Sequence, residues 1–534
     1  MDSQNIVLSE LTKALISSLA HKSQSTSTLE GDHFEVSQTV SFMGFLYERL
    51  RNAVEFNEEH LIRRMAIARI LRRRLAINPQ GKGEGENLMR ELLWGRYLLP
   101  KSTSMQDVSQ IQKIIDRYLY FLHQLNNQPI KKSSRPNLKK MVTDFLSCEI
   151  EETLNDALAN RRASSLYFFY QSLKARIEIP GVSEEALDLY FYVAAEEAFL
   201  KNDKPYIQYH IFTLHYGPLH DHNEKEIQSI AKSFDDHLAI TDKAMKNSYR
   251  DGLTKFAKKQ AAPFRIFLAL LDQTDNPEKI LDDQAALKSL VDKVCTEKYA
   301  ETGMKIRNAA IKSVIYIFFT KMLFVLVLEV PVSRYVFGEL KMLPLIINTL
   351  FPPLLMGLIV TFINPPSQKN TGRIYEKIID IITTDPGAVR NKIVLSTKSR
   401  LQQPSLLFLF TIVYVITFTM TFSLLYLLLE MIGFNIISKA VFIFFICVIA
   451  FFGYRIRQAA KEYVLETTSN TFISLLTFLF LPILYVGKWL SSKIARINLF
   501  IIFFDSLIET PFKFLIQVLE EWVRFIKARK DELI

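Results

Sequence analysis

The sequence predicts an all-α protein, a helical soluble domain followed by an α-helical polytopic membrane domain of five or six segments. Apolar residues of the first 300 positions recur with a period near 3.6, and no series of alternating strands is visible. Apolar runs of about 20 residues, the length that crosses a bilayer, occur only after that point. Charge divides the chain in the same way. Residues 1–300 hold 40 Lys and Arg against 40 Asp and Glu, and residues 301–534 hold 25 against 15.

Composition narrows the possible partners and cofactors. The neutral first half lacks the concentrated positive field that nucleic-acid binding needs, so no nucleic-acid partner is expected. Cys148, Cys295 and Cys447 are far apart and form no C-x-x-C pair, which disfavours a disulfide framework or a structural zinc site. No nucleotide, hydrolase or metalloprotease motif is present, so the sequence predicts no cofactor and no catalytic residue.

Residues 1–33 are expected to form an amphipathic helix and a polar linker. Leu8, Leu11, Leu15 and Leu19 recur at helical spacing, and the linker is rich in Ser and Thr. Glu10 and Lys13 interrupt any signal-peptide core.

Residues 34–308 are expected to form a cytoplasmic α-helical domain. Glycine- and proline-containing turns separate its candidate helices, and caps mark several of their starts. Examples are Ser183, and Asn276 followed by Pro277 at the first helical position. The candidate helices are 36–77, 86–98, 105–126, 137–160, 183–201, 223–248 and 277–300.

An arginine-rich segment within this domain has two interpretations. Residues 63–74 contain six arginines, of which Arg69, Arg72 and Arg73 oppose an apolar helix face. These three are a candidate patch for anionic lipid or an acidic partner. Alternatively, they form a solvated face that nearby glutamates such as Glu59 neutralise, and this second interpretation is favoured.

A histidine-rich segment raises the question of a metal site. His210 and His215 are five residues apart, which separates them by about 140° around a helix, and Gly217-Pro218 then ends the element. His220, Asp221 and His222 follow in the loop. Exposed or capping histidines explain the pattern better than a metal site, so no metal ligand is assigned.

Residues 309–490 are expected to form a transmembrane domain. Five stretches satisfy the length and hydropathy of a span: 311–330, 342–363, 406–429, 436–454 and 471–490. The positive charge of the segments before span one, between spans two and three, and between spans four and five predicts that they share the cytoplasmic side. The chain is thus expected to be a multi-pass protein of the plasma (inner) membrane with its N-terminal domain in the cytoplasm.

Residues 491–534 are expected to form an amphipathic C-terminal helix that is interfacial or re-entrant. Asp505, Glu509 and Lys513 share one helix face, and Pro511 interrupts the backbone. Lys321 lies near the middle of span one, where an ionisable group costs about 2.5–3.5 kcal/mol, so it needs a partner. Asp505 and Glu509 are candidates for that intramembrane pairing, and the stretch is otherwise an interfacial helix with its polar face to water.

These observations favour a scaffold, assembly or regulatory component of an envelope complex, with membrane lipids and protein partners or further copies of itself as partners. A transporter or channel is the alternative, since Pro344, Pro352, Pro353 and Pro482 interrupt spans that also carry charges. A membrane enzyme has no supporting motif.

The interfacial placement can be tested with cysteines introduced at Lys493 and Lys527. If residues between them lie on the surface, an impermeant thiol reagent labels both positions from the same side of sealed vesicles. Labelling of the two positions from opposite sides would show instead that the chain crosses the membrane between them.

Overall fold

The computed structural model describes most of the chain. The described residues are 6–23, 45, 48, 58–98, 103–128, 135–274, 276–336, 338, 341–361, 366, 368–388, 392–395, 404–465, 478, 480–490, 518, 521, 522, 525, 526 and 529. Helices contain most of them, and the strands among them are two residues long, which confirms the all-α class.

The chain forms two compact units, each of which draws on separate parts of the sequence. The helical unit comprises Ser9–Lys258 and Asp385–Leu395. The span unit comprises Lys259–Thr384 and the described part of Ser396–Leu499, together with residues 6–8. The sequence predicts one boundary near residue 308, whereas the polypeptide passes from one unit to the other several times.

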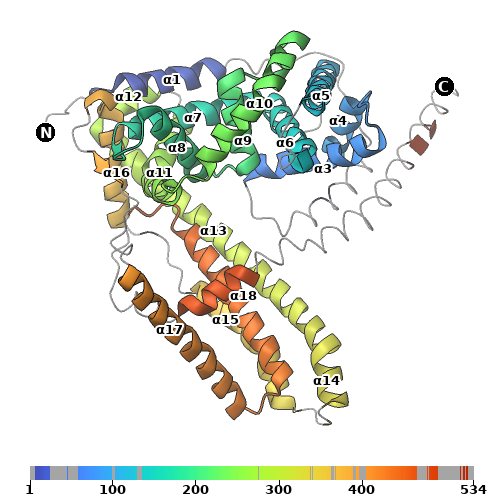
Figure 1. Ribbon diagram of the computed structural model, residues 1–534. Coiled ribbons are helices and arrows are strands. Elements are labelled where there is room, and N and C mark those ends of the chain that lie inside the picture. Colours follow the sequence, from blue (N-terminus) through green and yellow to red (C-terminus); the bar gives the residue numbers. More distant parts are fainter. Residues whose placement is uncertain are drawn as a thin grey trace. The chain divides into compact units, whose positions relative to one another are not determined.

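The helical unit is built from helices that the chain visits in order (Figure 1). They are α1 (Glu10–Ser23), α3 (Glu59–Ile77), α4 (Glu84–Trp94), α5 (Met105–Asn126), α6 (Arg135–Leu154), α7 (Asp156–Lys174), α8 (Glu184–Ala195), α9 (Lys204–Tyr216), α10 (Glu224–Met245) and the first part of α11 (Arg250–Asp272). Short elements complete it: the π-helical turn η1 (Glu196–Leu200), the 3-10 turns η2 (Leu219–Asp221) and η4 (Pro386–Ala388), and the strands β1 (Ile177–Glu178) and β2 (Ile393–Val394).

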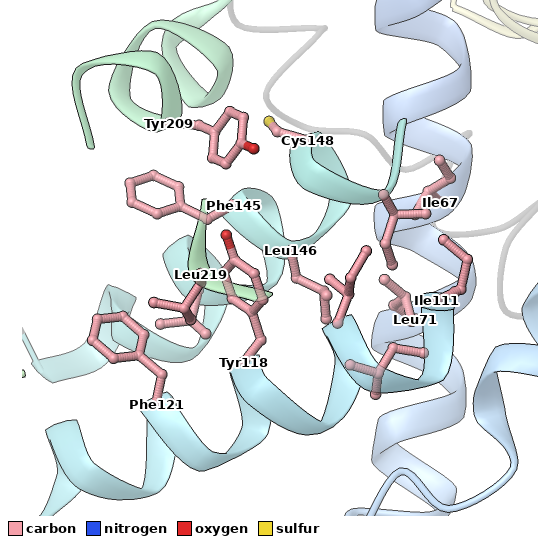
Figure 2. Packing of buried hydrophobic residues seen from close by; sticks show 14 of the residues in the cluster. Ile67, Leu71, Ile111, Tyr118, Phe121, Phe145, Leu146, Cys148, Tyr209 and Leu219 are labelled. Atoms are coloured by element: carbon pink, nitrogen blue, oxygen red, sulfur yellow. The ribbon is translucent and has the colours of Figure 1, made fainter. Parts of the chain in front are cut away.

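The main hydrophobic core joins α3, α4, α5, α6, α9 and α10. Figure 2 shows Ile67 and Leu71 of α3 beside Ile111 of α5, with Leu219 packed near Phe121 farther along the same helix. These side chains are almost completely removed from water, and each contributes about 1.5–3 kcal/mol relative to exposure. The core holds α6 and α9 side by side, and these two helices carry many of the buried polar groups described below.

Local sequence explains where several helices begin and end. Ser104 and Asp107 form a reciprocal capping box, so α5 begins and ends where the sequence predicts. The predicted helix 137–160 is instead broken at Asn155, whose side chain donates to the carbonyl of Glu151 at 3.1 Å and competes with the helix ladder. Ser183 caps α8 as predicted, and Pro277 begins α12, although the Asn276 side chain makes no capping bond.

A segment from the connection between spans two and three belongs to the helical unit. Asp385 accepts a hydrogen bond from the Glu10 backbone N–H at 3.1 Å, at the start of α1. Farther along, β2 pairs in parallel with β1 in the register Ile177 to Ile393. Between these contacts η4 packs against α7. The sequence showed only a basic loop here.

Within the described residues, the span unit contains four helices that are long and apolar enough to cross a membrane, fewer than the five or six predicted. Its elements are α12 (Pro277–Asp282), α13 (Gln284–Phe324), η3 (Val325–Glu329), α14 (Val330–Tyr335), α15 (Met342–Thr361), α16 (Gln368–Thr383), α17 (Pro404–Met431) and α18 (Ile436–Ala460), after the end of α11. The predicted span 471–490 is described mainly as the shorter apolar helix Phe480–Leu490, and residues 466–477 and 497–517 lie outside the described residues.

The helix that contains the first predicted span extends well beyond that span and includes a π-helical turn. The helix runs from Gln284 to Tyr335, with η3 between α13 and α14. Pro331 follows this turn and has no N–H to donate, so the altered hydrogen-bond register accommodates it. The turn ends at Glu329, whose side chain enters the cluster described below.

Asn370 of α16 joins three segments that lie outside the apolar parts of the spans. Its Nδ2 donates to Tyr299 Oη at 2.8 Å and to the Tyr463 carbonyl at 2.7 Å, and its Oδ1 accepts from the Leu465 backbone N–H at 3.0 Å. The segments before span one, after span two and after span four therefore lie at the same end of the bundle. Assignment of that end to the cytoplasm stays a prediction from loop charge.

Small residues permit close packing around α18. A Cβ on Gly453 would lie 2.8 Å from Ile359 Cγ2 of α15, and a Cβ on Gly487 would overlap the carbonyl of Cys447. Such close approach compensates for the weak hydrophobic drive between helices in lipid. By contrast, only about a tenth of the most apolar segment of α17 is buried, as expected for a helix that faces lipid.

Candidate functional site

An open cavity of about 770 Å³ lies within the helical unit, between α6, α7, α8, η1 and α9. Tyrosines and leucines line its walls, and ionisable side chains line its floor and rim. Its size falls in the range of sites that bind a small molecule or a peptide side chain. Carboxylates, histidines and an arginine of the helical unit are thus placed around a cavity that solvent can enter.

His210 of α9 lies on the floor of the cavity between two carboxylates. Its Nδ1 is 2.6 Å from Glu196 Oε1, and its Nε2 is 2.7 Å from Glu152 Oε1. Burial alone would lower the pKa of His210, but Glu196 and Glu152 outweigh that effect and raise it to about 10. At neutral pH the ring is therefore a cation that donates both of its N–H groups.

Glu196 is fully buried at the start of the π-helical turn η1. Besides the His210 bond, it accepts from Tyr192 Oη at 2.8 Å and from the Asn202 side-chain amide. Burial would raise the pKa of Glu196, but His210 and the donated hydrogen bonds bring it below its usual value. The π-helical turn, a feature frequent at functional sites, thus positions an ionised carboxylate beneath the cavity.

Glu149 organises the other end of the floor. It accepts from the backbone N–H groups of Leu219 and His220 at 3.0 and 3.1 Å, and from Tyr118 Oη at 2.8 Å. His220 Nδ1 lies 2.8 Å away, and this hydrogen bond raises the pKa of His220. Glu149 therefore closes the loop after α9 onto α6.

The remaining histidines of the predicted cluster serve local structure. His222 Nε2 donates to the Tyr216 carbonyl at 2.6 Å. The His215 ring lies 5.8 Å from the His237 ring, centroid to centroid, and is tilted relative to it. No three His, Cys, Asp or Glu side chains within the described residues are placed to hold a metal ion. The expectation of exposed histidines does not describe His210, because its partners on α6 and η1 cannot be recognised from local spacing.

The three arginines of the candidate patch each face a carboxylate of the same unit. Arg69 bonds Glu48 at 2.8 Å, Arg72 bonds Asp144 at 2.5 Å, and Arg73 bonds Glu91. Arg72 is the most accessible of the three, with 48% of its side chain exposed. The partners are distant in sequence, although the predicted Glu59–Arg63 contact is also present, at 3.8 Å.

Lys321 is completely buried in a polar cluster that connects three spans. Its Nζ donates to Asn348 Oδ1 of α15 at 2.6 Å and lies 4.5 Å from the centroid of the Phe445 ring. Asn348 Nδ2 donates in turn to Glu329 Oε1 at 2.6 Å, and Ser438 Oγ of α18 donates to the same oxygen. Glu329 Oε2 is buried and has no hydrogen-bond partner among the described residues.

The predicted partners of Lys321 in the C-terminal stretch cannot be compared with this cluster. Asp505, Glu509 and Lys513 lie outside the described residues, so their pairing with Lys321 stays a prediction. Asn348 and Ser438 were not identified from the sequence, because a single amide or hydroxyl within an apolar run is a weak signal. Asn348 nevertheless carries a side-chain amide within span two, and such polar side chains often join helices in a membrane by hydrogen bonds.

Comparison of the chain with protein-family models, with curated proteins and with solved structures gave no match.

Replacing His210 by glutamine tests the buried carboxylate–imidazolium–carboxylate arrangement. We expect a loss of about 3 kcal/mol in the free energy of unfolding at pH 6, because Glu196 loses its cationic partner while buried. Since the pKa of His210 rises from 6.5 to about 10 on folding, its contribution is complete below pH 6.5 and is lost as the pH approaches 10.

The measurement is denaturant unfolding of the detergent-solubilised chain, followed by the fluorescence of Trp94, which is buried at the end of α4. The exposed His123 provides the matched control, and His123→Gln should change stability by less than about 0.5 kcal/mol. Equal effects of the two substitutions, or a His210 effect that persists above pH 10, would contradict the assignment.

Proposed function

We propose that this membrane protein is a scaffold or regulatory component of an envelope complex, in which the helical unit binds a protein partner. Four apolar helices compatible with membrane crossing support the membrane part of this statement. The excess of Lys and Arg on the segments joined by Asn370 supports a cytoplasmic placement of the helical unit.

The observation that carries the proposal is the state of the ionisable groups in the cavity. A general base needs a free nitrogen, but both nitrogens of His210 are hydrogen-bonded to carboxylates. Cys148 of α6 does not line the cavity and offers no accessible thiolate, because it is completely buried and burial raises its pKa well above its usual range. Fixed charges around an open space are better suited to recognition than to proton transfer.

The structure also offers a route by which binding would bear on the spans. Helix α7 lines the cavity through Tyr167 and Tyr170, and it packs against η4. The segment that contains η4, between spans two and three, also contains β2. This strand pairs with β1, and the Ile393 N–H donates to the Arg176 carbonyl at 2.7 Å. A partner that moves α7 therefore acts on the polypeptide between spans two and three. This favours a regulatory role over simple anchorage.

Affinity purification of the tagged full chain from cross-linked native membranes tests the proposal. We expect a reproducible partner protein, or a defined homo-oligomer, to be recovered. Tyr167→Glu, at the exposed edge of the cavity, should reduce that recovery. Leu158→Glu should not, because Leu158 is an exposed residue of α7 that does not line the cavity. A monomeric chain with no reproducible partner would refute a scaffold.

A transporter or channel is the second candidate, and one observation favours it. The Lys321 cluster lies at the junction of spans one, two and four. It holds buried ionisable groups, and Glu329 Oε2 is a buried carboxylate oxygen with no hydrogen-bond partner among the described residues. Ionisable groups held inside a span are costly and often mark a path for ions or protons.

Proton flux into proteoliposomes, followed with an enclosed pH dye, tests this candidate. If the cluster conducts, Glu329→Gln lowers flux to the level of protein-free liposomes, because Glu329 would no longer carry a proton. Glu376→Gln is the control, since Glu376 is an exposed residue of α16, outside the apolar parts of the spans and away from the cluster. Identical flux from the unchanged protein and Glu329→Gln would exclude the cluster as a conduction site.

A further inference from the structure

The cavity of the helical unit carries more negative than positive side chains. Its carboxylates are Glu149, Glu152, Asp156, Glu185, Asp188 and Glu196. Its cationic side chains are Arg162, His210 and His220. The cavity is therefore a site of negative potential, and its partly enclosed walls strengthen that potential relative to open solvent.

Internal pairing compensates the charges on the floor of the cavity. His220 balances Glu149, Lys174 bonds Asp188 at 2.6 Å, and Arg162 bonds Glu151 at 2.8 Å. A single cation, His210, lies between Glu152 and Glu196. Because Arg63 also bonds Glu151, at 2.9 Å, two cations meet that carboxylate, and the floor as a whole is balanced in charge.

Two negative charges lie at the rim, in the first turns of α7 and α8. Asp156 and Glu185 pair with no cation among the described residues. Charges near the N-terminus of a helix are stabilised there, so both carboxylates are held in place without a cationic partner. A cationic ligand would complete the balance.

The walls suit a cation carried on an aliphatic stem. The ring of Tyr170 already lies beneath an ammonium group, because Lys174 Nζ is 5.9 Å from the ring centroid. Tyr167 is 59% exposed at the edge, where its ring is available to a ligand in the same way. Leu166, Leu189 and Leu214 supply apolar contacts for the methylene groups of such a stem.

We infer that the cavity receives a lysine or arginine side chain of the partner's peptide chain, an inference that rests on the proposed scaffold function. Its ammonium or guanidinium group lies between the rim carboxylates and the tyrosine rings, and its stem packs on the leucines. The floor beneath it is fixed by its own ion pairs and hydrogen bonds. The partner is therefore a basic segment with apolar residues beside the cation.

Binding of a defined peptide to the full chain in detergent tests this inference. The probe is the heptapeptide Gly-Ser-Leu-Lys-Leu-Ser-Gly with a neutral fluorophore, followed by fluorescence anisotropy. We expect it to bind about ten-fold more tightly than the same peptide with glutamine in place of lysine. The double variant Asp156→Asn, Glu185→Gln should weaken binding about five-fold, because it removes both uncompensated rim charges.

The matched control is the double variant Asp251→Asn, Glu224→Gln. These two carboxylates are also exposed first-turn residues, of α11 and α10, and they lie away from the cavity. The control changes net charge equally, so any general electrostatic effect on the peptide or on the micelle is the same in both variants. Binding to the control should stay within about two-fold of the unchanged protein.

Three outcomes would overturn the inference: equal binding of the lysine and glutamine peptides, equal weakening by the two double variants, or displacement of the peptide by free cadaverine at matching concentrations. The last would show that the site recognises a free amine. A partner that co-purifies equally with the unchanged protein and with the rim double variant would also refute this site, while leaving the scaffold function intact. Failure to recover any partner would refute the scaffold function itself.

Discussion

An ionised side chain that leaves water must find a partner of opposite charge or several hydrogen-bond donors, and much of this structure depends on that constraint. Glu151 of α6 is its clearest case, because its side chain is completely buried. Arg63 and Arg162 bond its carboxylate at 2.9 and 2.8 Å, and the Tyr206 hydroxyl donates to it as well. One carboxylate thereby holds α3, α6, α7 and α9 in fixed register. The arginine-rich segment of α3 is the complement of buried acids rather than an isolated basic patch.

The span unit satisfies the same constraint with fewer groups. Lys321 and Glu329 belong to one continuous helix, but their charges are connected through Asn348, an amide on another helix. An amide serves this purpose because it can accept from the ammonium and donate to the carboxylate at once. Asn370 uses both groups of its amide in the same way at the other end of the bundle. It donates to the Tyr299 hydroxyl and accepts from the Leu465 backbone N–H. Two asparagines thus each join several segments of the span unit through polar contacts.

The sequence predicted the features that depend on local pattern. The class of the fold, four of the spans and the limits of α5 follow from periodicity, apolar length and flanking turn residues, all of which are properties of neighbouring residues. Helices α7, α9 and α11 were not predicted, and for α7 a single predicted helix over 137–160 obscured the break at Asn155.

Long-range partners were not predictable from the sequence in the same way. His210 is separated by 58 residues from Glu152, and no local spacing indicates that the two side chains meet. Lys321 was recognised as needing a partner, and among the described residues an amide on a neighbouring span provides a hydrogen bond that no local spacing indicates. The sequence therefore indicated which groups require compensation and left open which groups provide it.

The contribution of Asp385–Leu395 to the helical unit has a consequence for biosynthesis. A ribosome releases the residues of α1 and β1 long before those of η4 and β2, and two spans lie between them in the sequence. Until residue 395 has emerged, the N-terminus of α1 lacks the Asp385 carboxylate and β1 lacks its neighbouring strand. Completion of the helical unit therefore has to wait for synthesis of the first two spans, and until then α1 and β1 lack these contacts.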